Sequence, residues 1–316
     1  MKRILFLLSV FLCSATSYAL TVFGETSADA KIDYSTANDA ESSVVALGAL
    51  SAVYLGNGWF ITAAHCNPTV NGTITQNGAK GYIDSVVSSI NGVDLSLFHV
   101  GDLSSFSSLK AAKFSTEVFS ELSATVFFSE KPSTFFGYSE LLLVGNGKSG
   151  DANVEIDSNG YATISANNAY AVRSGTAPVV NKSLNLATNA YSATGYIITA
   201  SENAYGTASA QVGDSGGGMF LEYENDWYLV GILGVVIGPT ASTTSSTFGN
   251  LTKTNTTISQ SSNSSIVSNI SLSGGVNLQE HWNEIEAIVI PEPAETATVF
   301  AILLFAVAAY LKRIKI

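Results

Sequence analysis

Short apolar runs, separated by glycine and asparagine, cover most of this chain. Positions 45–55 and 59–62 are two such runs, and a Gly-Asn-Gly turn separates them. Positions 218–223 and 227–233 repeat the arrangement around a Glu-Asn-Asp turn. Apolar, β-branched and aromatic runs on either side of such turns are typical of β-hairpins. The pattern therefore predicts an all-β body, folded as a sandwich or a barrel.

Two stretches of the body depart from this pattern. Near the end, apolar residues recur at helical spacing after a plausible cap formed by Asn277 and Glu280, which predicts one amphipathic helix. Its apolar face carries Leu278, Trp282, Ile285 and Val289. Residues 238–273 are rich in Ser, Thr, Asn and Gly with almost no charge, and we interpret them as a long exposed insertion.

The first 19 residues have the pattern of a secretory signal peptide. Lys2 and Arg3 precede an apolar run, and small residues at Ser17 and Ala19 predict cleavage after Ala19. The alternative is a buried N-terminal helix, which the charged start and the small residues disfavour. The signal predicts an exported protein, extracellular or at the cell surface.

Residues 291–316 form a second segment outside the folded body. Pro291-Glu292-Pro293 precedes an apolar run over 297–311 and a basic end at 312–316. As a helix the run is about 22 Å long, which is short against a bilayer core of about 30 Å. The order of parts resembles the bacterial PEP-CTERM sorting signal, and the resemblance implies an exosortase-type enzyme as a partner that removes the segment. A plain C-terminal membrane anchor is the alternative, and in either case the body lies outside the membrane.

Composition and charge exclude several classes of protein. Only 12% of residues are charged, which argues against a coiled coil and against a charged disordered chain. The net charge is −11 and no basic stripe occurs, so we expect no nucleic-acid partner. Of the two cysteines Cys13 belongs to the signal peptide, which leaves Cys66 alone in the mature chain and excludes an internal disulfide.

Three fragments carry the residue types of a nucleophilic hydrolase. His65 lies in Thr-Ala-Ala-His-Cys after the first hairpin, and Asp94 lies in an apolar Asp-Leu-Ser-Leu segment. Ser215 lies in Gly-Asp-Ser-Gly-Gly-Gly before the second hairpin. A serine nucleophile needs a base, a carboxylate that orients the base, and backbone N–H donors for the developing oxyanion. Glycine at 213 allows a tight turn that presents the N–H groups of Gly213 and Ser215.

In that order, these fragments closely resemble the trypsin/chymotrypsin-like serine endopeptidases, over roughly residues 22–289. The resemblance implies two antiparallel six-stranded barrels with a C-terminal helix and a site between the barrels. We expect the N-terminal barrel over about 22–115 and the C-terminal barrel over about 116–290, within a protease domain of 20–290. His65 would be the general base, Asp94 the orienting carboxylate and Ser215 the nucleophile, with Gly213 and Ser215 as the oxyanion hole.

The resemblance also implies substrate-pocket and activation residues. The pocket floor falls on Ser209 and the walls on Gly234, Val236 and Gly275, which predicts a neutral, shallow pocket for small or medium apolar residues. A shift of the alignment by one residue would move Val236 away from the wall and admit Phe or Tyr.

Activation in the family pairs a new N-terminal ammonium with the aspartate before the nucleophile. Here that pair would be Val22 and Asp214. The alternative is that backbone donors satisfy Asp214 and no zymogen exists.

Two departures from the family pattern concern the immediate surroundings of the candidate base and carboxylate. The cysteine that would pair with Cys66 is absent, so we expect Cys66 to be a buried free thiol. Gly234 stands where the family has a serine that steadies the aspartate, so Asp94 needs other donors.

The predicted activity is hydrolysis of peptide bonds in protein or peptide substrates through an acyl-enzyme, by a monomer. We expect no cofactor and no metal, because no cluster of side chains has metal-ligand spacing. The other hypothesis is a surface-displayed binding or matrix protein on an inactive protease scaffold. Labelling of Ser215 by a phosphonofluoridate distinguishes the two.

Overall fold

The computed structural model describes the chain in several segments. The predicted signal peptide and the predicted sorting segment both lie outside them. In the described part of the chain no helix has the length and apolar character needed to cross a membrane. The described residues are 21–22, 38–123, 139–149, 153–156, 162–165, 169–170, 172–184, 195–202, 208–210, 213–237, 246–248, 251–254, 257–260 and 270–289.

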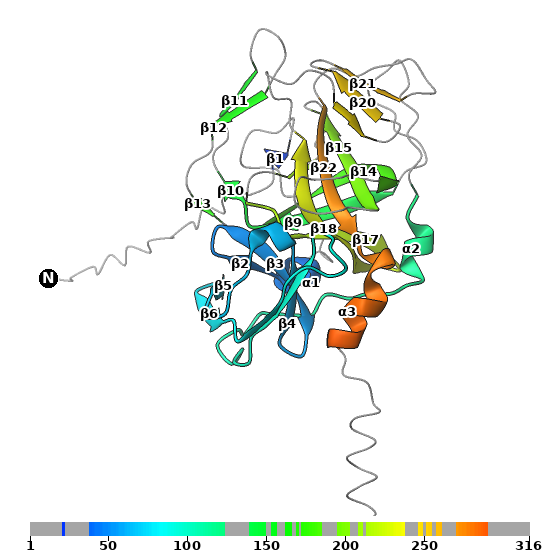
Figure 1. Ribbon diagram of the computed structural model, residues 1–316. Coiled ribbons are helices and arrows are strands. Elements are labelled where there is room, and N and C mark those ends of the chain that lie inside the picture. Colours follow the sequence, from blue (N-terminus) through cyan, green and yellow to red (C-terminus); the bar gives the residue numbers. More distant parts are fainter. Residues whose placement is uncertain are drawn as a thin grey trace, which may run out of the picture.

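An antiparallel sheet of seven strands forms the first half of the body, in the order β6-β5-β2-β3-β4-β8-β7 (Figure 1). Asn57 and Gly58 join β3 to β4 with φ of 51° and 82°, the left-handed conformation that a two-residue hairpin turn requires. The apolar run at 45–55 is split between two strands, because the chain turns at Gly48 with φ of 61°. The strands are β2 Val44–Leu47, β3 Leu50–Gly56, β4 Trp59–Thr62, β5 Thr73–Gln76, β6 Ala79–Tyr82, β7 Ser85–Val87 and β8 Ser96–His99.

The second half is a closed barrel of six antiparallel strands, in the order β14-β15-β22-β18-β17-β9. Its β17–β18 hairpin is the second one that the sequence predicts, and the left-handed residues Glu224 and Asn225 form the turn. The strands are β9 Glu140–Gly145, β14 Arg173–Leu184, β15 Tyr196–Glu202, β17 Gly218–Tyr223, β18 Asp226–Ile237 and β22 Ile270–Asn277.

The predicted all-β class, with two sheets and a C-terminal helix, is confirmed. The second sheet closes with six strands as expected, whereas the first contains seven strands. In the stretch expected as an insertion, β19, β20 and β21 form a small sheet, and β22 already begins at Ile270. These three strands are Ser246–Phe248, Leu251–Thr254 and Thr257–Gln260.

The remaining elements are short. Three two-stranded pairs are formed by β1 Thr21–Val22 with β16 Ala208–Ser209, β10 Lys148–Ser149 with β13 Ala169–Tyr170, and β11 Asn153–Ile156 with β12 Ala162–Ser165. The helices are α1 Asn38–Ser43, α2 Val118–Glu121 and α3 Trp282–Val289, and the 3-10 turns are η1 Ala64–Cys66 and η2 Leu278–Glu280.

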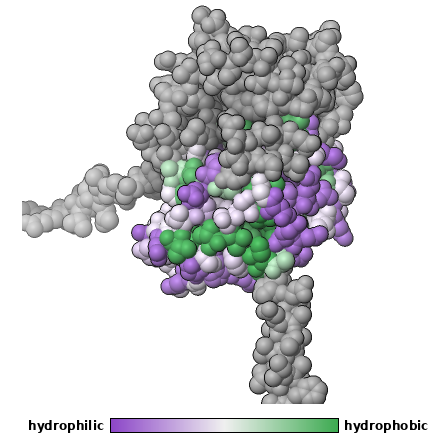
Figure 2. All heavy atoms as spheres, viewed as in Figure 1, coloured by the Kyte–Doolittle hydropathy of each residue, from purple (hydrophilic) through white to green (hydrophobic). Residues whose placement is uncertain are grey.

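The predicted C-terminal helix is present as η2 followed by α3. Asn277 begins it by accepting the N–H of Gln279, so Asn277 caps η2. Leu278, Ile285 and Val289 are buried, as the helical spacing predicts. Figure 2 shows hydrophilic residues around a band of apolar residues on the described part of one face.

The two halves share one core and are joined by specific contacts. Leu229 of β18 donates its N–H to the carbonyl of Lys113, in the segment that leaves the first sheet. The ring of the following residue, Phe114, stacks on Trp282 of α3. A third contact joins β3 to the turn before β17, where Ser51 donates its N–H to the carbonyl of Ser215. That last contact lies at the candidate site.

Candidate active site

A short 3-10 turn places His65 at the end of β4. The turn is closed by the N–H of Cys66, which donates to Ala63, and by Asn67, whose φ of 49° ends it. Ala64 and Cys66 are buried on either side of His65. Because its neighbours anchor the turn in the core, the His65 side chain is directed outward and is 37% exposed.

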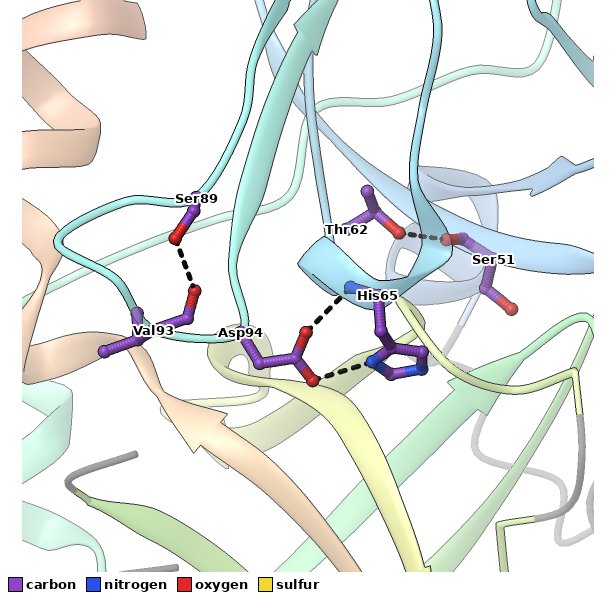
Figure 3. A network of polar contacts seen from close by, with 6 residues as sticks. All are labelled: Ser51, Thr62, His65, Ser89, Val93 and Asp94. Atoms are coloured by element: carbon purple, nitrogen blue, oxygen red, sulfur yellow. Dashed lines mark hydrogen bonds and ion pairs between the residues drawn. The ribbon is translucent and has the colours of Figure 1, made fainter. Parts of the chain in front are cut away.

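Asp94 holds His65 through both of its carboxylate oxygens (Figure 3). Its Oδ1 accepts the backbone N–H of His65 at 2.9 Å, and its Oδ2 lies 2.7 Å from Nδ1 of the ring. Asp94 is 2% exposed, so these bonds are formed in a largely water-free setting. A carboxylate at Nδ1 fixes the proton on that nitrogen and leaves Nε2 as the base.

The loop before β8 brings Asp94 to this position. Left-handed residues at Asn91 and Gly92 reverse the chain, and Ile90 closes the loop by donating its N–H to Leu95. The hydroxyl of Ser89 donates to the carbonyl of Val93, directly before the aspartate. The carboxylate position is therefore fixed by backbone contacts within the loop.

Ser215 lies in a turn that only glycine permits on its C-terminal side. Gly216 has φ of 85°, and a Cβ there would lie 2.0 Å from the carbonyl oxygen of Ser51 and 2.1 Å from Oγ1 of Thr62. A Cβ on Gly217 would lie 2.2 Å from the carbonyl oxygen of Val144. The turn is thus packed tightly against β3, β4 and β9.

Backbone hydrogen bonds fix the same turn to the second barrel. Gly216 donates its N–H to the carbonyl of Leu233 at 2.7 Å, and Leu233 donates in return to Gly217 at 2.8 Å. The N–H of Ser51 holds the Ser215 carbonyl at 2.9 Å. Strands of both halves therefore hold the half-buried Ser215 in place.

Gly213 and Ser215 carry the two backbone N–H groups that are predicted to stabilise an oxyanion. The carbonyl of Gly213 accepts a hydrogen bond from the hydroxyl of Ser51 at 3.1 Å. The N–H groups of Gly213 and Ser215 donate to no other group in the described part of the chain. Backbone donors without internal partners are what stabilisation of an oxyanion requires.

The fold brings together the segments that carry the three candidate residues. Thr62, three residues before His65, contacts Gly216 beside Ser215. On the other side, Asp94 Oδ2 lies 3.1 Å from the Cβ position of Gly234, the residue after Leu233. Ser215 Oγ makes no hydrogen bond to the His65 ring in this structure; such bonds are often long in sites without substrate.

A backbone donor holds the carboxylate of Asp214, the predicted activation residue. Asp214 is fully buried, and its Oδ1 accepts the N–H of Gly147 at 2.7 Å. Cβ positions at Gly145 and Gly147 would lie 2.3 and 2.6 Å from that oxygen, so the two glycines make room for it. Val22 pairs with Ala208 in the β1–β16 pair, and its pairing with Asp214 stays a prediction.

The predicted pocket residues lie on several strands. Ser209 pairs with Thr21, and Val236 pairs with Ser273 of β22. Gly275 faces the barrel interior, where a Cβ would lie 2.3 Å from Sδ of Met219, and Gly234 faces Asp94. The pocket roles of these residues stay predictions.

Sequence reasoning missed Ser273. It is 1% exposed, and its Oγ accepts the N–H of Ala210 at 2.9 Å, directly beside Ser209. The signal that could have found it is the alternation of a strand, since Ser273 lies two residues before Gly275 and so on the same face.

Cys66 is a buried free thiol, as predicted. Burial raises the pKa of Cys66 to about 11, and the nearby charge of Asp94 adds to the shift against the hydrogen bonds to Thr62 and Ala63. The thiol is therefore neutral at ordinary pH and packs as a small apolar group.

A second histidine–aspartate pair lies at the edge of the first sheet. His99 Nδ1 contacts Asp84 at 2.8 Å, and its Nε2 lies 3.2 Å from the carbonyl oxygen of Asn57. Both ring nitrogens of His99 therefore lie beside oxygen atoms at this edge of the sheet. In the described part of the chain no group of three or more His, Cys, Asp or Glu side chains could hold a metal ion.

Comparisons with known proteins find similarity only at the level of solved structures. No family model matches the chain, and no curated protein matches it. One similar structure is an inactive mutant of Rv3671c from M. tuberculosis H37Rv, with 12% identity and a TM-score of 0.46 over 85% of this chain and 97% of that one. Another is the MamO protease domain from Magnetospirillum magneticum, with 16% identity and a TM-score of 0.42 over 78% of this chain and 97% of that one. A function for this chain accordingly has to be argued from its own residues.

Proposed function

We propose that this protein is a serine endopeptidase that uses Ser215, His65 and Asp94. The observation that carries the proposal is the pair of bonds from buried Asp94 to the ring and the backbone of His65, beside a glycine turn that holds Ser215. Asp94 keeps Nδ1 protonated, so Nε2 takes the proton of Ser215 as the hydroxyl attacks the peptide carbonyl. The imidazolium that forms is stabilised by the buried carboxylate.

The N–H groups of Gly213 and Ser215 stabilise the oxyanion of the tetrahedral intermediate. His65 then returns its proton to the leaving amine, and the acyl group remains on Ser215. In the second half of the reaction, His65 takes a proton from water, and the hydroxide attacks the acyl-enzyme. The bond from the acyl carbon to Ser215 Oγ then breaks, His65 returns the proton to that oxygen, and the carboxylic acid is released. No metal or organic cofactor takes part in these steps.

The proposal is tested by labelling with diisopropyl fluorophosphate, read by intact mass and peptide mapping. We expect one adduct, on Ser215, and none in the Ser215→Ala or His65→Ala variants. Ser105→Ala and His99→Ala are the matched controls, because Ser105 is exposed and His99 already holds Asp84 and Asn57. If the correctly processed protein forms no adduct, the enzyme proposal is wrong. The hypothesis of a surface-displayed binding or matrix protein on an inactive protease scaffold is then favoured.

We further propose that cleavage follows small or medium apolar residues. A pocket floor at Ser209 offers no carboxylate to a lysine or arginine, and the burial of an unpaired cation is unfavourable. Ser273, buried against Ala210, adds a second neutral side chain next to this strand. Profiling with a peptide library tests the proposal, and dominant cleavage after Arg or Lys would contradict it.

Export and C-terminal processing are also part of the proposal. The apolar run at 297–311 is short for a stable span, which favours a segment that is removed after about Pro293 over a permanent anchor. Intact mass of protein from its native host should show loss of this segment and of residues 1–19. Retention of 312–316 would instead indicate a simple membrane anchor.

A further inference from the structure

Gly234 of β18 packs against Oδ2 of Asp94 and has no side chain of its own. The three heavy atoms nearest to its Cβ position are Asp94 Oδ2 at 3.1 Å, Tyr196 Cε1 at 3.8 Å and Tyr196 Oη at 3.9 Å. The carboxylate oxygen that binds the histidine ring and the tyrosine hydroxyl therefore border the same small volume.

The hydroxyl of Tyr196 is buried and has no hydrogen-bond partner in the described part of the chain. Tyr196 begins β15, a strand of the closed barrel, and is fully buried. A buried hydroxyl without a partner is unfavourable and uncommon in folded proteins, so one aimed at a functional site needs an explanation.

The hydroxyl of Tyr196 is suited to donate a hydrogen bond and not to ionise. Burial raises the pKa of Tyr196, and the negative charge of Asp94 raises it further. The phenol therefore stays protonated at ordinary pH. Its O–H bond rotates freely and, in a low-dielectric interior, the favourable orientation is toward the nearest carboxylate.

We infer that Tyr196 is a positioning residue, which directs its O–H toward Oδ2 of Asp94 across Gly234 and so fixes the carboxylate that orients His65. The inference rests on the proposed function. It also answers the question that the glycine at 234 raises, because a hydroxyl from β15, on the far side of β22 from β18, lies near the Cβ position of Gly234 and close to the oxygen that no side chain at 234 reaches. Tyr196 touches neither substrate nor reacting atoms and acts only through Asp94.

The test compares Tyr196→Phe, which removes one oxygen, with the same variant carrying Gly234→Ser. A serine Cβ at 234 would lie close to Oδ2 and bring a new hydroxyl within its reach. We expect Tyr196→Phe to lower kcat for p-nitrophenyl acetate hydrolysis about tenfold with KM unchanged, and Gly234→Ser to restore most of it. Tyr82→Phe, at an exposed tyrosine, is the matched control and should behave as the unmodified protein.

A second readout does not depend on activity. The NMR signal of the proton between His65 Nδ1 and Asp94 should move in Tyr196→Phe, return in the double variant and stay in place in Tyr82→Phe. If the unmodified protein fails to react with the fluorophosphate, the proposed function fails while this signal still tests the inference. Unchanged kcat and an unchanged signal in Tyr196→Phe would overturn the inference, and so would loss of folding, because the hydroxyl would then support the barrel and not the carboxylate.

Discussion

At the scale of single residues, Asp94 determines more of the candidate chemistry than any other side chain. One buried carboxylate accepts from the backbone and the ring of His65, and the hydroxyl of Tyr196 lies near the same Gly234 Cβ position as its Oδ2. A buried charge is stable only when it is paired and hydrogen-bonded in this way. The same contacts that stabilise the charge set the tautomer of the histidine.

Replacement of Asp94 by asparagine keeps the shape but not the tautomer. The amide can donate to Nδ1, which would place the proton on Nε2 and leave no base for Ser215. We expect Asp94→Asn to slow fluorophosphate labelling of Ser215 by roughly 10³-fold or more. The circular dichroism spectrum should stay unchanged, which would show that the variant keeps the fold. A rate within tenfold of the unmodified protein would show that Asp94 does not orient the base.

Cys66 gives a prediction with a defined pH dependence. With the pKa raised to about 11, the thiol is protonated below that pH, so the reactive thiolate is scarce at pH 8. Relative to a model thiol with a pKa of 9.0, the thiolate population at pH 8 is lower by about a hundredfold. Ellman's reagent should therefore react with the folded protein at least a hundredfold more slowly than with the protein in guanidinium, and equal rates would contradict a buried Cys66.

At the scale of elements, the turn that carries Ser215 depends on close backbone approach. Gly216 and Gly78 have nearly the same positive φ, 85° and 86°. Around Gly78 nothing lies within 4 Å of a Cβ, whereas a Cβ on Gly216 would overlap the Ser51 carbonyl and the Thr62 hydroxyl. Alanine substitutions at the two glycines therefore distinguish the cost of backbone strain alone from the added cost of steric overlap.

This pair gives a matched test of the turn. Gly78→Ala should lower the free energy of unfolding by about 1 kcal/mol, the cost of the left-handed conformation alone, and leave labelling of Ser215 unchanged. Gly216→Ala should lower it by at least about 2 kcal/mol more and abolish labelling, because Ser215 must move. Equal effects in urea unfolding would show that the turn is not packed as described.

At the scale of the whole molecule, the candidate site belongs to neither half alone. His65 and Asp94 come from the first sheet, while Ser215 precedes a strand of the closed barrel (Figure 1). The halves are joined at the site by Ser51 and, away from it, by the stacking of Phe114 on Trp282. The stability of the molecule should therefore depend on contacts between the halves that lie far from the chemistry.

Trp282 tests this dependence. Trp282→Ala removes a large half-buried ring and the stack on Phe114, and we expect it to lower the free energy of unfolding by about 3 kcal/mol. Trp282→Phe keeps a ring there and should lose less than half as much. Both losses are measured by urea unfolding, and a Trp282→Ala protein as stable as the unmodified one would show that the C-terminal helix does not fasten the two halves.

Local features of the sequence were sufficient for the β class, both hairpins, the terminal helix and the free buried thiol. These follow from alternation, turn residues and cysteine number, which act over a few positions. The three fragments around His65, Asp94 and Ser215 also pointed to one site, because a serine hydrolase needs those residue types together. The seventh strand of the first sheet and the three strands in the polar insertion were not legible, since short polar strands lack a clear alternation.

Only the tertiary structure decided the contacts between segments that lie far apart in the chain. No local pattern marks Tyr196 as the hydroxyl near Asp94, because its position depends on how β15 and β18 pair with the two edges of β22. The hydrogen bonds from Gly147 to Asp214 and from Ser51 to Ser215 likewise join segments far apart in the chain, so no local pattern marks them. The sequence by itself determined which side chains perform the proposed chemistry, since chemistry depends on residue type. Which groups hold those side chains depends on the register between strands, and that is fixed only when the whole core packs.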